Sequence, residues 1–155
     1  MSVYEPPASN LKVNDNYRGK PAKAIFFALL ISMFGSIIGA IVVVIIFSIY
    51  WGSIGINAEQ IESLTQKDTS ILIAYLIESG IFSIWSGHYV AKKTNYQEYK
   101  YCVIMVVISS LIGALIMLSA PAMYSDQPLW YSIVGFICYP IMVLYGCWLF
   151  VKSKT

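Results

Sequence analysis

Four long stretches of apolar residues, separated by short polar connections, dominate the hydrophobic pattern of this chain. They cover residues 24–50, 70–91, 101–120 and 129–151. Each is close to the roughly 20 apolar residues with which a helix crosses a bilayer core about 30 Å thick. Stretches such as Ile41 to Ile46 lack the alternation of a transmembrane β-strand. The pattern predicts an all-α membrane protein whose domain, residues 23–155, is a four-transmembrane-helix bundle.

The connections between the stretches add two expectations. The connections after the second and third stretches are short, which predicts that spans two, three and four lie as antiparallel neighbours. In the longer first connection, Asn57 and Gln60 have the spacing of a helix capping box. Ile61 and Leu64 then share one helical face. We expect a short helix on the membrane surface there, with an irregular loop as the alternative.

The overall composition agrees with a membrane protein. Of 155 residues, 58% are hydrophobic and 12% charged, whereas a soluble domain has roughly 45–50% and about 25%. The net charge of +2, without a basic cluster, predicts no nucleic-acid partner. Cys102, Cys138 and Cys147 lie inside apolar stretches and form no Cys-x-x-Cys pair. We therefore expect no disulfide framework, metal site or cofactor.

Basic residues set the expected orientation of the spans. Nine of the ten fall on one side: Lys12, Arg18, Lys20, Lys23, Lys92, Lys93, Lys100, Lys152 and Lys154. Only Lys67 falls on the other side. Because cytoplasmic loops carry an excess of Lys and Arg, this bias predicts that both termini lie in the cytoplasm.

The segment before the first span, residues 1–22, has few apolar residues and no periodicity, which predicts a disordered cytoplasmic tail. It opens with Tyr4 followed by Pro6 and Pro7. This opening resembles the Tyr-x-Pro-Pro tail of small four-span bacterial inner-membrane proteins of unassigned function. The stretch from Ser86 to Lys93 is also similar to such proteins. The resemblance covers less than a fifth of the chain; it implies a bacterial inner membrane and no activity.

Glu78 is the only charged residue within the second stretch. A carboxylate at the bilayer centre costs roughly 2.5–3.5 kcal/mol, so we expect the side chain to face another helix or to be protonated. Tyr75 lies one turn away on the same face, and four further polar residues reach a similar depth: Ser36, Ser109, Ser110 and Tyr139. At that depth Pro140 leaves the carbonyl of Phe136 without its helical donor. These residues predict a polar cluster that serves in packing, in partner recognition, or as an ion or proton site.

Small residues on the spans form a second pattern. In lipid, small side chains let helix backbones approach closely. The candidates for helix packing are Gly35, Gly39, Gly80, Ser83, Gly87 and Gly113. Gly80, Ser83 and Gly87 lie on the face opposite Glu78. Most of these small residues fit packing within the bundle. Span two, however, has two marked faces, the Glu78 face and the opposite glycine face, which suggests that one of them meets a second copy or another membrane protein.

The sequence offers little basis for catalysis. His88, the only histidine, lies about 15 Å along the helix from Glu78, too far for an acid–base pair. The chain has no nucleophile elbow, phosphate-binding loop or zinc-protease motif. We therefore expect no enzyme. An intramembrane enzyme is the third alternative, after a binding or assembly protein and a transporter or channel protomer.

We expect an integral inner-membrane protein that binds, assembles or protects against another membrane component through helix–helix contacts. An assembly factor or an immunity-type protein would have this form. Its partners would be the lipid bilayer and another membrane protein or a further copy of itself. The alternative is one protomer of an oligomeric small transporter or channel, with Glu78 on the ion or proton path.

Overall fold

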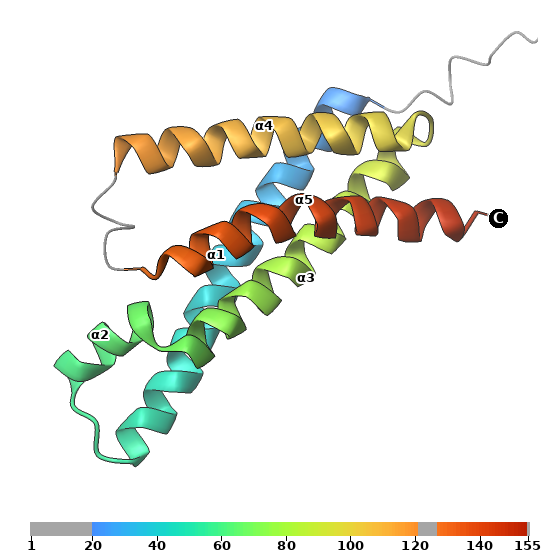
Figure 1. Ribbon diagram of the computed structural model, residues 1–155. Helices are drawn as coiled ribbons and strands as arrows, with labels where there is room; N and C mark the ends of the chain where they lie inside the picture. Colours follow the sequence, from blue (N-terminus) through green and yellow to red (C-terminus); the bar gives the residue numbers. More distant parts are fainter. Residues whose placement is uncertain (1–19, 121–126, 155) are drawn as a thin grey trace, which may run out of the picture.

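The computed structural model describes residues 20–120 and 127–154, and the regular elements within these ranges are all α-helices (Figure 1). They are α1 (Pro21–Ser53), α2 (Ala58–Lys67), α3 (Thr69–Thr94), α4 (Glu98–Ser119) and α5 (Leu129–Lys152). All except α2 are long and apolar enough to cross a membrane. The four-transmembrane-helix bundle predicted from the sequence is confirmed. The chain is a multi-pass membrane protein.

The helices extend somewhat beyond the predicted spans. α1 has 33 residues, which corresponds to about 50 Å and exceeds the thickness of the bilayer core of about 30 Å. α3 continues to Thr94, where Asn95 takes the left-handed conformation with φ of 52° and ends the helix. The predicted tail, 1–22, lies outside the described residues except at its end, where residues 21 and 22 already belong to α1.

The connection between α1 and α3 contains the expected short helix. The Asn57 side chain accepts a hydrogen bond from the Gln60 amide at 2.9 Å, and the Gln60 side chain accepts one from the Asn57 amide at 3.2 Å. This reciprocal pair satisfies two amide groups that the first turn of a helix otherwise leaves free. Ile61 and Leu64 are half-buried, whereas Glu59 and Glu62 are exposed.

α3 is the central helix of the bundle. It packs most extensively against α5 and α1, whereas α4 contacts its neighbours less (Figure 1). Helices that follow one another in the chain do contact each other, as the short connections predicted. The most extensive contact, however, joins α3 and α5, which are not consecutive and run in the same direction.

Two glycines bring α3 and α5 together. Gly87 on α3 lies against the main-chain carbonyl of Val143, and Gly146 on α5 lies against the main-chain carbonyl of Ile84. A β-carbon at either position would collide with a backbone oxygen, which cannot rotate away. Because lipid provides no hydrophobic force between helices, such close backbone contact is a main source of their attraction.

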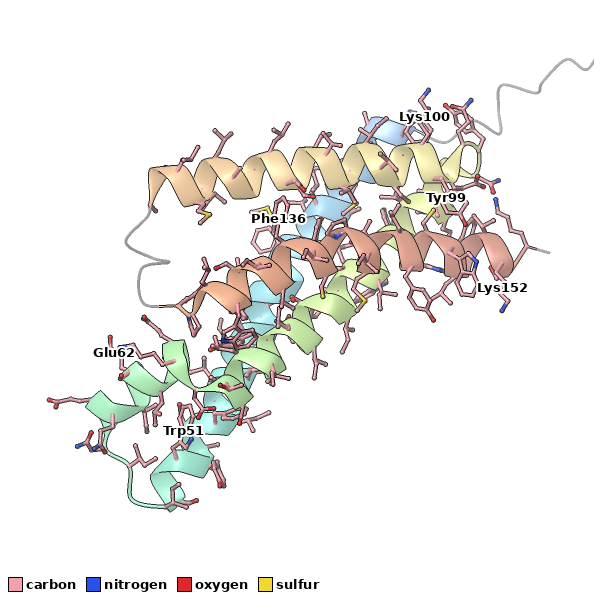
Figure 2. The ribbon with its side chains drawn as sticks, in the orientation of Figure 1. Trp51, Glu62, Tyr99, Lys100, Phe136 and Lys152 are labelled. Carbon is pink, nitrogen blue, oxygen red and sulfur yellow. The ribbon has the colours of Figure 1, made fainter. Side chains whose placement is uncertain are left out.

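The main cluster of buried apolar residues lies toward one end of the bundle, which we call the basic end, whereas Trp51, Ile71 and Leu72 are buried at the other end. Seven lysines stand at the basic end of the helices: Lys20, Lys23, Lys92, Lys93, Lys100, Lys152 and Lys154. Lys154 pairs with Glu98 at 2.6 Å and so links the end of α5 to the start of α4. Figure 2 shows Lys100 and Lys152 at this end, whereas Trp51 and Glu62 lie at the opposite end.

Most large apolar side chains on the long helices point outward. In the most apolar window of each helix, between 6% and 28% of the residues are buried within the chain. Exposed examples are Ile45 on α1, Ile77 on α3, Leu111 on α4 and Ile141 on α5. Such a surface suits a hydrocarbon solvent.

Replacing Gly87 by Ala should destabilise the bundle. The added β-carbon meets the Val143 carbonyl, so we expect the free energy of unfolding in mixed micelles to fall by about 1–3 kcal/mol. Gly113→Ala is the matched control, because a β-carbon there meets no atom within 4 Å and alanine favours a helix by up to about 1 kcal/mol over glycine. Equal losses in both variants would contradict this account of the contact.

Candidate functional site

α4 separates from the rest of the bundle along its second half. Its two buried residues, Cys102 and Met105, lie near its start at the basic end. Residues 113–119 are all exposed. Figure 1 shows the far end of α4 away from α1 and α3. Because α4 packs against the other helices at its basic end only, a space remains beside its other end.

A cavity of about 600 Å³ occupies this space, with walls from α1, α3, α4 and α5. Its volume falls within the range of about 300–1,000 Å³ that is usual for ligand sites. Serines from every wall line it: Ser32 and Ser36 on α1, Ser79 and Ser83 on α3, Ser109 and Ser110 on α4, and Ser132 on α5. No residue of its described lining is charged. We call it the serine-lined cavity.

Several of these serines already donate their hydroxyl hydrogen to their own helix. Ser79 donates to the carbonyl of Leu76 at 3.2 Å, and Ser83 donates to the carbonyl of Ser79 at 2.7 Å. Ser109 donates to the carbonyl of Val106 at 2.9 Å. Each oxygen keeps its capacity to accept a hydrogen bond, so these walls offer acceptors without leaving donors unpaired.

Tyr139 on α5 brings a phenolic hydroxyl to the inner part of the cavity. This oxygen is buried and has no hydrogen-bond partner of regular geometry among the described residues, although Ser32 and Ser109 lie beside it. Pro140 follows within the helix and lacks an amide hydrogen for the carbonyl of Phe136. Phe136 also lines the cavity, and Figure 2 shows it between α5 and α4.

Part of the polar cluster expected from the sequence lies in this cavity. Ser36, Ser109, Ser110 and Tyr139 all line it. Sequence reasoning missed Ser32, Ser79 and Ser132, although serines four residues apart on one helix (32 and 36, 79 and 83) gave a signal.

Glu78 and Tyr75 are not among the residues that line the cavity. The Glu78 carboxyl lies against Gly39 on α1, and one turn further along α3 Phe82 lies against Gly35. Two side chains of α3 thus pack against the two glycines of α1. One carboxyl oxygen of Glu78 is buried and lacks a hydrogen-bond partner among the described residues.

The other small residues occupy different surroundings. A β-carbon on Gly113 would meet nothing within 4 Å, and one on Gly80 would meet only Met142 at 3.8 Å. Gly113 makes no close helix contact because α4 diverges there, and Gly80 on α3 meets only a side chain of α5 at an ordinary contact distance. Ser83 is buried and lines the cavity, while Gly87 contacts α5.

The two marked faces of α3 are both covered within the chain. α1 lies on the face with Glu78, and α5 lies on the face with Gly87. The expectation that one of these faces is free for a partner is therefore wrong. Contact with α1 accounts for the Glu78 face of the central helix α3, and contact with α5 accounts for its Gly87 face.

His88 and the buried cysteines Cys102 and Cys147 are not among the described residues that line the cavity. His88 stacks edge-on against Phe150 with ring centres 5.4 Å apart. Cys102 donates to the carbonyl of Gly87 at 3.6 Å. Among the described residues, no group of three His, Cys, Asp or Glu side chains is arranged to hold a metal ion.

Replacing Tyr139 by Phe should stabilise the protein. A buried polar group without a partner costs about 1–3 kcal/mol, so loss of this hydroxyl should raise the free energy of unfolding by about 1 kcal/mol. Tyr145→Phe on the same helix is the control, because Tyr145 is 47% exposed and should change stability by less than about 0.5 kcal/mol. A loss of stability in Tyr139→Phe would show that the hydroxyl is paired.

Comparison of the chain with protein-family models, with curated proteins and with solved structures gave no match.

Proposed function

We propose that this protein is a non-catalytic binding protein of a bacterial inner membrane, with its basic end in the cytoplasm. It holds another membrane component beside α4, in the role of an assembly factor or an immunity-type protein. The observation that carries the proposal is the serine-lined cavity, a site of about 600 Å³ between four apolar helices whose described lining is uncharged. Sites of this kind bind by shape and by a few polar groups.

The chemistry of the lining supports binding rather than catalysis. The polar groups of its described lining are hydroxyls and the amide of Gln127, and these described residues include no carboxylate, imidazole, amine or thiol. A serine nucleophile requires an adjacent base, which none of the described lining residues provides.

The exposed half of α4 supports the same role. Residues 113–119 pack against no other described helix closely enough to be buried. A bound component can therefore contact this half of α4 without breaking contacts of the core, which lie at the basic end.

A transporter or channel with Glu78 on the ion path has less support. The Glu78 carboxyl lies against Gly39 between α1 and α3, away from the residues that line the cavity. No contact among the described residues favours that alternative.

Photocrosslinking in native membranes tests the proposal. A benzophenone amino acid at Ile112 faces the cavity, whereas one at the neighbouring Leu111, which is 60% exposed, faces outward. We expect Ile112 to capture a component of defined mass, and Leu111 to capture only a spread of bulk lipids.

Mass spectrometry of the adducts measures this difference. The two positions are adjacent on one helix and have the same polarity, so expression and insertion should match. Identical adducts from both positions would contradict a binding role for the cavity.

A further inference from the structure

Two buried cysteines meet where α3, α4 and α5 converge near the basic end. Cys102 on α4 and Cys147 on α5 are fully buried, belong to the same apolar cluster and are both free thiols. Their side chains lie within hydrogen-bonding reach of each other, and Cys102 also donates to the carbonyl of Gly87 on α3 at 3.6 Å. We propose that these two cysteines, which we call the thiol pair, form a reversible disulfide that fixes α4 to α5.

The thiol pair lies where α4 is attached to the rest of the bundle. The buried residues of α4, Cys102 and Met105, are near its start, and the ion pair of Glu98 with Lys154 joins the same ends of α4 and α5. Further along, α4 diverges and residues 113–119 are exposed. A disulfide at this point therefore strengthens the contact that holds α4, which supplies one wall of the serine-lined cavity.

Both thiols lie close to the basic ends of their helices. Cys102 is four residues from the start of α4 at Glu98, and Cys147 is five residues from the end of α5 at Lys152. At the helical rise, each thiol is about 6–8 Å from the helix end. Burial protects a thiol from charged and bulky reagents. A small uncharged oxidant reaches this depth when α4, which packs less extensively than α3 or α5, opens locally.

The oxidant that fits these conditions is a peroxide. One thiol, after losing its proton, attacks a peroxide oxygen; the O–O bond breaks, and a sulfenic acid forms with release of water. The second thiol attacks the sulfenic sulfur, the S–S bond forms, and the hydroxyl group leaves with the thiol proton as water. The two thiols together lose two electrons and two protons, and one hydrogen peroxide becomes two water molecules.

The surroundings of the thiol pair make the disulfide a response to oxidation rather than a permanent link. On the cytoplasmic side proposed for the basic end, reductants keep thiols free, and disulfides that form there are usually transient. The disulfide itself carries no charge and leaves no polar hydrogen unpaired, so it suits the apolar cluster. It also closes a loop that contains most of α4 and α5, which restricts the unfolded chain.

Counting free thiols after peroxide treatment tests the proposal. The full chain in phosphatidylcholine vesicles is treated with hydrogen peroxide, which is then removed with catalase. The protein is denatured and labelled with polyethylene glycol maleimide, which adds one mass step per free thiol. We expect three steps before treatment, one after it, and three again after dithiothreitol. Mass spectrometry of the digest should find Cys102 linked to Cys147.

Cys138 on the same helix supplies the matched control variant. It lies nine residues before Cys147, about 14 Å away along α5. Cys138→Ala should leave the thiol pair intact, so that two steps fall to none. Cys102→Ala removes one partner, and both remaining thiols should persist. Oxidation of the wild-type chain after unfolding in SDS should lose the preference for linking Cys102 to Cys147, because the fold no longer holds them together.

A second measurement tests the effect on α4. The midpoint of unfolding by SDS in mixed micelles should shift to a higher SDS fraction in the oxidised protein and return after dithiothreitol, because the disulfide restricts the unfolded chain. Peroxide should produce no such shift in Cys102→Ala.

Three mass steps after peroxide, a disulfide that includes Cys138, or a loss of labelling that dithiothreitol does not reverse overturns the assignment of the thiol pair. An oxidised protein that unfolds at the same midpoint as the reduced one overturns the proposed fixing of α4, even where the disulfide forms. The Ile112 crosslinking tests the binding role separately, so failure of one proposal is distinguishable from failure of the other.

Discussion

The close approach of α3 and α5 at Gly87 and Gly146 is the contact on which the bundle depends. Each glycine lies against a main-chain carbonyl of the other helix. In lipid, where burial of apolar surface gives no advantage, van der Waals contact between backbones has to replace it. Because α3 is fixed to α5 on one side and to α1 on the other, these three helices form a unit to which α4 is added.

The cavity follows from the way α4 joins this unit. Its buried residues, Cys102 and Met105, and the pairing of Glu98 with Lys154 all lie at the basic end. Further along, α4 carries Gly113 and Ala114, which are too small to reach a neighbour across the gap. Attachment of α4 at one end and its divergence at the other leave the space that serines from four helices surround.

Two polar features of the membrane interior have separate roles in this arrangement. Glu78 belongs to the contact between α1 and α3, where its side chain lies against Gly39. The serines and Tyr139 belong to the cavity. A single charged residue in a span draws attention first because its transfer into lipid is costly, yet the space with room for a ligand is lined, among the described residues, by hydroxyls and apolar side chains.

The spans, the short helix capped by Asn57 and Gln60, and the depth of Ser36, Ser109 and Tyr139 follow from local sequence features, because apolar length, capping and helical rise act locally. Packing between helices, in contrast, makes α3 central, brings Gly146 against Ile84 and keeps Glu78 out of the described lining of the cavity. Depth along a helix can be counted from the sequence. The direction in which each face points depends on how helices distant in the chain rotate and cross, which no local pattern records.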